Sequence, residues 1–174
     1  ALGDGDTLAV PRFDKARDDR LDSEAWPRAS GPVDLILFEG WCVGSEAQPD
    51  DALTDPVNAL EASEDADGRW RRYVNAALES EYPDLFKRLD RLVYVAAPDF
   101  DAVYRWREEQ EQKLRERAGD TGSRVLTHAE VVRFVHHFER VTRQNFTRLP
   151  ERAAATVHLD RDHRAIALDV RDDR

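Results

Sequence analysis

Two short apolar runs constrain the fold of this 174-residue chain more than any other feature of its sequence. Val33–Phe38 (VDLILF) and Leu92–Ala97 (LVYVAA) are almost continuously apolar, as are strands that are covered on both faces of a parallel sheet. Between them, helical character begins at Asp55-Pro56 and continues to about Glu81, with a break at Gly68. Alternation of strands and helices predicts an α/β fold, a three-layer sandwich with a parallel sheet in the middle.

Two long helices are expected after the second apolar run. Asp99 is a typical capping residue, and the helix that it begins is predicted to continue to about Arg117. Thr127 and Glu130 have the spacing of a capping box, which predicts a second helix that ends at Leu149.

The chain ends in a predicted antiparallel hairpin. Thr156–Leu159 and Ala165–Val170 have strand character, and the turn Asp160–His163 separates them. A shorter extended run, Thr7–Phe13, lies near the other end of the chain. Because 174 residues suit one domain, we expect a single domain over residues 1–174.

Composition narrows the possible functions. The formal net charge is −10, the opposite of the balance that duplex nucleic acid requires. No apolar stretch approaches the roughly 18 residues of a membrane span, so neither nucleic acid nor a membrane is an expected partner. Cys42 is the single cysteine, which excludes an internal disulfide and fits a reducing, cytoplasmic setting.

Two absences suggest that the chain is part of a longer protein. The sequence contains no methionine, even at position 1. It also contains no G-x-x-x-x-G-K-S/T motif, the loop with which many kinases hold phosphates.

Glu39 is the first candidate for chemistry. It follows the predicted strand Val33–Phe38 and precedes Gly40, and ligands of α/β sheets bind beyond the carboxyl ends of the strands. A carboxylate there can orient Mg²⁺ through water or position a nucleophile. An ordinary acid that caps the next loop explains the same pattern equally well.

Charged residues also gather in a loop near the start of the chain. Six charges lie within seven residues, at Asp14, Lys15, Arg17, Asp18, Asp19 and Arg20. A solvated loop is the better interpretation of the pattern alone. The alternative is a cluster that binds an anionic substrate.

Two predicted helices carry arginines with two possible roles. Arg105 and Arg107 lie on the helix after Asp99, where Glu111 is placed to pair with Arg107 or Arg115 on the surface. The alternative is a lid whose arginines stabilise transferring phosphates. On the next helix Arg140 lies on a polar stripe with Arg143 nearby, a pattern typical of a solvated face.

Several segments together resemble the D-glycerate 3-kinase-like branch of the bacterial P-loop kinases, relatives of uridine kinase, phosphoribulokinase and pantothenate kinase. The similarity follows the family's order over nearly the whole chain. The matching segments are PRFDKA, DDR, LFEGWCVG, NALE, WRRYVN, LFKRLD, APDF, WREEQE and FERVTR. The family's phosphate-binding loop and its DDFY-like segment would lie upstream, so the chain looks like the carboxyl-terminal part of such a kinase.

The resemblance implies roles for the candidate residues. Glu39 would be the strand-end acid near Mg²⁺ and the γ-phosphate of ATP. Asp14, Lys15 and Arg20 would lie near the acceptor. The remaining candidates would contact phosphates or belong to a lid, and they are Arg105, Arg107, Arg140 and Arg143.

The resemblance therefore implies an ATP- and Mg²⁺-dependent kinase of a small hydroxy acid, most simply D-glycerate. The alternatives are a catalytically inactive fragment or interaction module, and a kinase of another metabolite such as a nucleoside or pantothenate. In this family the strand before the phosphate loop lies between the two strands predicted here. Without it, the isolated chain is expected to be inactive and poorly stable.

Overall fold

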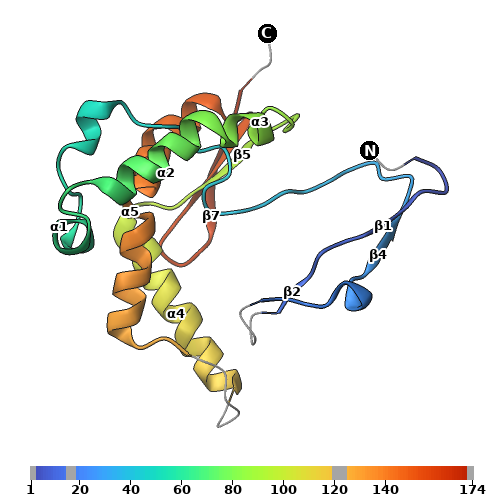
Figure 1. Cartoon of the computed structure of the whole chain (residues 1–174), viewed down its shortest axis with the longest axis horizontal. Helices are drawn as coiled ribbons and strands as arrows, with labels where there is room; N and C mark the ends of the chain where they lie inside the picture. Colours follow the sequence, from blue (N-terminus) through green and yellow to red (C-terminus); the bar gives the residue numbers. More distant parts are fainter. Residues whose placement is uncertain (1–2, 15–18, 119–124, 172–174) are drawn as a thin grey trace. The chain divides into compact units, whose positions relative to one another are not determined.

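The computed structural model describes residues 3–14, 19–118 and 125–171 (Figure 1). Contacts divide these residues into two compact units, one that ends at Gly40 and one that begins at Trp41. Each unit is described by itself. None of the helices in the described ranges is long and apolar enough to cross a membrane.

The first unit is built from short antiparallel pairs and one helical turn. Leu8 lies opposite Ala29 in the first pair, and Phe13 lies opposite Arg20 in the second. The predicted extended run near residue 7 is therefore divided between two pairs. The elements are β1 (Thr7–Ala9) with β4 (Arg28–Ser30), β2 (Phe13–Asp14) with β3 (Asp19–Arg20), and η1 (Ser23–Ala25).

The predicted buried strand Val33–Phe38 is wrong. The segment is extended, but none of its residues is assigned to a strand. Leu35, Ile36 and Leu37 are 74%, 75% and 85% exposed. A strand needs a neighbour for its backbone N–H and C=O groups, and no described strand pairs with this segment. Its sequence is suited to burial, and the described structure provides nothing to bury it.

The second unit contains the sheet, a three-stranded one in the order β5-β6-β7. β5 (Val93–Ala96) runs parallel to β6 (Ala155–Leu159), and β7 (Ala165–Val170) is antiparallel to β6. The predicted strand at Leu92–Ala97 and the hairpin are both confirmed. The fold class is therefore confirmed as α/β with a parallel pair and an antiparallel hairpin.

The two faces of this sheet differ in exposure. Ala96 and Thr156 are buried on one face, with 8% and 4% exposed. Tyr94 lies on the same face, opposite Thr156, and burial raises its pKa to about 12. The other face carries apolar side chains that are more than half exposed, namely Val93, Val95, Ile166, Leu168 and Val170. The expected three-layer sandwich has helices on both faces of the sheet. Among the described residues, no helix covers the apolar side chains of this face.

Helices make up most of the second unit (Figure 1). The predicted helical stretch is divided at Gly68, as expected, where the backbone is left-handed with φ 72°. It begins later than predicted because Asn58 caps it, with Oδ1 accepting from the Glu61 N–H at 2.9 Å. The helical elements before β5 are η2 (Asp50–Leu53), α1 (Ala59–Glu64), α2 (Arg69–Ser80) and α3 (Tyr82–Phe86).

The two long helices are α4 (Phe100–Ala118) and α5 (His128–Arg152). Both reciprocal bonds of the predicted capping box are present at the start of α5. The predicted end at Leu149 is wrong, because Pro150 lies inside the helix. Proline removes only one helical hydrogen bond, and Ala153 N still donates to Leu149 O at 2.8 Å.

The exposed apolar segment leads to a first prediction. Replacing Leu37 by lysine is expected to leave the thermal midpoint unchanged and to reduce aggregation, because the side chain buries little area. Light scattering and a thermal melt of the chain measure both. Leu53→Ala is the control, since Leu53 is 2% exposed and such a change costs about 2–5 kcal/mol. Equal destabilisation by both changes would contradict the observed exposure.

Candidate functional site

The carboxyl edge of the parallel pair carries a charged cluster. Asp99 follows β5, and Arg161 follows β6 at the start of the hairpin turn. Arg161 Nη2 donates to Asp99 Oδ2 at 2.5 Å. Asp99 Oδ1 accepts from the Ala102 N–H at 2.7 Å, which caps α4. This is the edge at which α/β sheets bind ligands.

Electrostatics keep Asp99 ionised. The hydrogen bond from the Ala102 N–H holds its pKa below the usual value, and the hydrogen bond and charge of Arg161 act in the same direction. The charge of Arg105 contributes as well. Asp99 therefore serves as an anchor for the hairpin rather than as a proton donor at neutral pH.

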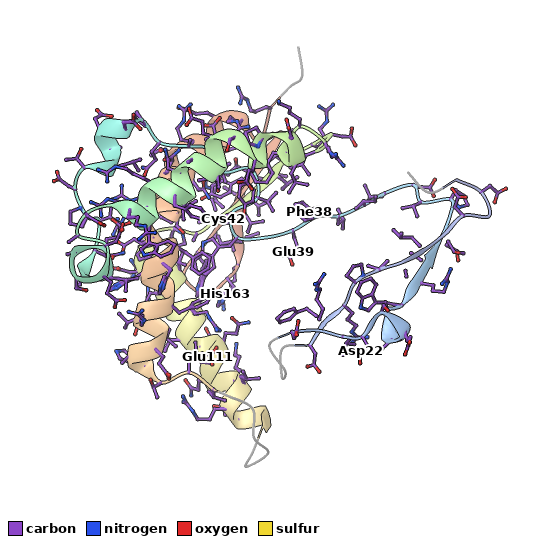
Figure 2. The ribbon with its side chains drawn as sticks, in the orientation of Figure 1. Asp22, Phe38, Glu39, Cys42, Glu111 and His163 are labelled. Atoms are coloured by element: carbon purple, nitrogen blue, oxygen red, sulfur yellow. The ribbon has the colours of Figure 1, made fainter. Side chains whose placement is uncertain are left out.

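An aromatic contact fixes the hairpin turn on α4. The Trp106 ring stacks on His163 with centroids 4.4 Å apart, and Trp106 Nε1 donates to Arg161 O at 3.0 Å. His163, labelled in Figure 2, has a positive φ of 65°. The sequence predicts the Asp160–His163 segment only as a turn. Its run of charged residues is the signal that could have indicated its contribution to this edge.

Arg105 and Arg107 lie on α4 in different surroundings. Arg105 is exposed. Arg107 contacts Glu111 through Nη2 and donates through Nη1 to Gln110 Oε1 at 2.9 Å. Its guanidinium also lies 4.9 Å from the centroid of the Phe134 ring. The expected pairing of Arg107 with Glu111 is confirmed, but Glu111 is buried, with 5% exposed, rather than on the surface. The contact with Phe134 ties α4 to α5.

Arg140, predicted on a solvated stripe, is buried instead, with 8% of its surface exposed. It donates to both Glu61 carboxylate oxygens at 2.8 and 2.6 Å. It also donates to Ala52 O and Asp55 O at 2.7 Å each and to Gln48 Oε1 at 3.3 Å. These five bonds match the five N–H donors of a guanidinium. All five donors of Arg140 are therefore used by acceptors within the chain.

Arg71 on α2 forms a second buried centre beside Arg140. It donates to Leu53 O at 2.7 Å and to Thr54 O at 3.0 Å. It also donates to Asp65 O at 2.7 Å and pairs with the Asp65 carboxylate at 3.3 Å. Since buried charges require such partners, Arg71 fixes the loop that precedes α1.

Arg143 lies one turn further along α5 and is more exposed. Its Nε donates to Glu139 Oε1 at 2.7 Å, and its guanidinium lies 5.1 Å from the Phe100 ring centroid. With Gln144, Thr147 and the loop at residues 46–49, it lines an open, polar depression.

The remaining candidates lie in the first unit. Asp14 lies opposite Asp19 between β2 and β3, and Arg20 is exposed on β3. Lys15 lies outside the described residues. Glu39 is exposed, on the extended segment that Figure 2 shows running through Phe38. It does not follow a strand, contrary to the prediction, because its segment pairs with none.

Two neighbours of Glu39 belong to the second unit. Trp41 stacks on Phe138 with centroids 4.6 Å apart, and its Nε1 donates to Thr142 Oγ1 at 2.9 Å. Trp41 therefore ties the chain to α5 two residues after Glu39. Burial raises the pKa of the Cys42 thiol, so Cys42 lacks the thiolate character of a nucleophile.

The curated relatives that the chain matches are named as kinases. No family model matches it. It is 33% identical over 139 residues to D-glycerate 3-kinase, chloroplastic, from Arabidopsis thaliana, a match of 78% of this chain and 27% of the relative. It is 31% identical over 147 residues to the uncharacterized kinase mug58 of Schizosaccharomyces pombe, which covers 78% of this chain and 48% of the relative.

Solved structures show the same fold. D-glycerate 3-kinase from Cryptococcus neoformans var. grubii superposes with a TM-score of 0.69 at 18% identity, over 94% of this chain and 60% of that one. The chain thus shares the fold of that structure. The relatives and structural neighbours of the chain are D-glycerate 3-kinase and related kinases, which confirms the resemblance seen in the sequence. The chain spans about a quarter to a half of the curated relatives that it matches.

The burial of Arg140 leads to a second prediction. Arg140→Leu leaves the Glu61 carboxylate, whose side chain is only 12% exposed, without its main partner, which is expected to cost about 3–5 kcal/mol of unfolding free energy. Arg133→Leu on the same helix breaks an ion pair with Glu64 whose two side chains are 51% and 52% exposed, and is expected to cost at most about 1 kcal/mol. Urea unfolding measures both. Similar losses would show that Arg140 is not the centre of the network.

A third prediction concerns pH. Burial raises the pKa of Glu61, but hydrogen bonds from Arg140 and the Val57 N–H, with the charges of Arg140 and Arg71, lower it by more, so the folded-state pKa is below 4.5. A lowered pKa stabilises the folded state above pH 4.5, and this contribution is lost as pH falls through the folded pKa.

Glu61→Gln should therefore lower stability at pH 7 and flatten its decline in acid. Urea unfolding free energies measured from pH 7 to pH 3 test this. The exposed Glu79, on α2, supplies the control Glu79→Gln. An unchanged acid slope in Glu61→Gln would exclude Glu61 as a source of the pH dependence.

Proposed function

We propose that this chain is the greater part of the catalytic domain of a kinase that transfers the γ-phosphoryl group of ATP to a small hydroxy acid, with D-glycerate as the first candidate. The sequence match to a protein named D-glycerate 3-kinase, at 33% identity over 139 residues, is the observation that carries the proposal. The proposal includes ATP, Mg²⁺ and a cytoplasmic setting.

Glu39 is the proposed acid near the metal. In proteins Mg²⁺ is usually bound by one or two carboxylates together with substrate phosphates and water. An exposed carboxylate such as Glu39 fits this mode of binding. When bound, the metal neutralises charge on the phosphoryl oxygens. The residue itself would orient water bound to the metal.

Arginines are the proposed partners of the phosphates. Phosphoryl transfer depends on positioning and charge stabilisation, and a guanidinium binds phosphate oxygens with a planar fork. Arg105 is exposed on the helix that leaves the carboxyl edge of β5, so it is the best placed of the predicted set. Arg107 and Arg143 already form ion pairs with Glu111 and Glu139, so we assign these two arginines secondary roles in the lid. Arg140 uses its five donors within the chain, so we assign it no phosphate contact.

The acceptor is proposed to contact residues of the first unit. A hydroxy acid presents a carboxylate and a hydroxyl group. Arg20 and Lys15 supply positive charge for the carboxylate, and Asp14 supplies an acceptor for a hydroxyl. These assignments rest on the matching segments PRFDKA and DDR.

A second candidate is a kinase-like chain without activity of its own. The observation that favours it is the absence of a G-x-x-x-x-G-K-S/T motif from the sequence. We propose that the motif is supplied upstream in the active protein. A genuine start codon near Ala1 would instead favour an interaction module, and phosphorylation of a nucleoside or pantothenate in place of glycerate would identify another kinase.

A fourth prediction separates these candidates. The 174-residue chain is expected to show no kinase activity, because nothing in its sequence supplies the loop that holds the β- and γ-phosphates. The full reading frame that includes an upstream loop is expected to phosphorylate D-glycerate. A coupled assay of ADP release measures both proteins. Activity in the short chain, or a full protein inactive on every hydroxy acid tested, would each contradict the proposal.

A fifth prediction tests Glu39 in the full protein. Glu39→Gln is expected to lower kcat by about 100-fold or more, because it removes a charge that acts on the transition state. Stability should not change, since the side chain is exposed. Glu24→Gln, an exposed acid of the same unit, is the matched control. Unchanged turnover at saturating Mg²⁺ would make Glu39 an ordinary loop acid.

A further inference from the structure

A cavity of about 400 Å³ opens at the edge of the sheet opposite to the carboxyl edge. Leu92 precedes β5 and Ala154 precedes β6, and both line the cavity. Arg171 also lines it, since β7 is antiparallel and ends at this edge. Two backbone bonds fix the three residues, from Ala154 N to Leu92 O at 2.8 Å and from Arg171 N to Ala154 O at 2.9 Å.

Asp99 and Arg161 lie at the other ends of the same strands. The cavity is therefore separated from the carboxyl edge by the length of the strands. Figure 1 shows α3 and the end of α5 on the side of the sheet where the chain leaves β7. Any ligand in this cavity would be distinct from a substrate at the carboxyl edge.

The charge of the cavity is opposite to that of the chain. Among the described residues, Arg91, Arg152 and Arg171 line it with one acid, Asp90, and Glu46 pairs with Arg152 from outside the lining, although the whole chain has a net charge of −10. The arginines come from three places, the loop after α3, the end of α5 and the end of β7. Three guanidinium groups around one cavity favour a carboxylate or phosphate ligand.

One arginine is held in place by the fold. Arg152 Nη1 donates to Gly44 O at 2.8 Å and lies 3.1 Å from Glu46 Oε1. Gly44 has φ +82°, and a Cβ there would meet Leu92 Cδ2 at 3.0 Å. The wall that carries Arg152 is therefore closely packed, so the guanidinium is positioned before any ligand binds.

The cavity also has an apolar floor. Ala153 is 1% exposed, and Phe86, Leu89 and Leu92 complete the lining. Small-molecule sites commonly combine such a floor with a few charged groups, in volumes of about 300–1,000 Å³. The ligand that fits carries an anionic group for the arginines, and the apolar residues leave room for a small organic body beside that group.

We propose that this cavity is a second anion-binding site, specific for a small carboxylate or phosphate monoester and separate from the proposed active site. The inference does not depend on kinase activity, because it rests on the cavity and its arginines alone. Binding therefore tests it directly in the 174-residue chain.

The experiment is a calorimetric titration of the chain with inorganic phosphate and, separately, with citrate, at constant ionic strength set by chloride. One saturable site is expected for at least one probe. Arg171→Ala is expected to weaken it about 5- to 50-fold, the loss of a charge-assisted contact. Arg152→Gln should weaken it as well. Arg171 is exposed, so this change is not expected to affect folding, which circular dichroism verifies.

Arg88→Ala is the matched control, because Arg88 is exposed in the same loop as Arg91 and does not line the cavity. The affinity of the Arg88→Ala variant for each probe is expected to stay within about 2-fold of that of the unchanged chain. Saturation by phosphate alone would assign the site to phosphate esters, and saturation by citrate alone to carboxylates. No saturation up to about 20 mM of either probe, or equal weakening by Arg88→Ala and Arg171→Ala, would overturn the proposal.

Discussion

The guanidinium of Arg140 is the contact on which the second unit depends. It joins α5 to the Glu61 carboxylate on α1 and to the loop before α1 through five hydrogen bonds. Arg71 holds the same loop from α2. The packing between these helices is therefore largely ionic and polar. Removing charges from water is costly, so this arrangement is stable because the guanidinium donors have well-placed acceptors, and at Arg140 all five of them do.

Local sequence signals predicted the second unit well. The capping box at Thr127, the capping residue Asp99 and the hairpin near His163 are all decided by neighbouring residues, and the structure contains each of them. The apolar run Val33–Phe38 shows the limit of such signals. Its apolar composition is suited to burial, but whether the segment forms a strand depends on a pairing partner from another part of the sequence. The described structure contains β5 with a partner and this segment without one.

The candidate site was predicted less completely for a related reason. Arg140 occupies a polar stripe that is typical of solvent exposure, and its burial becomes visible only with Glu61, which is 79 residues away in sequence. Arg161 and Trp106 are likewise joined across 55 residues. Contacts of this kind have no local pattern. The pairing of Arg107 with Glu111 was predictable, because four residues on a helix bring two side chains together.

The acceptors used by the two buried arginines have a consequence for how this protein can vary. Arg71 and Arg140 bind mostly carbonyl oxygens, those of Ala52, Leu53, Thr54, Asp55 and Asp65. A carbonyl oxygen is present whatever the side chain. The exposed positions 52, 54 and 55 are therefore free to drift in sequence while the loop keeps its path. Homologues can diverge in this loop and still superpose there, provided that both arginines and the carboxylates of Glu61 and Asp65 are retained.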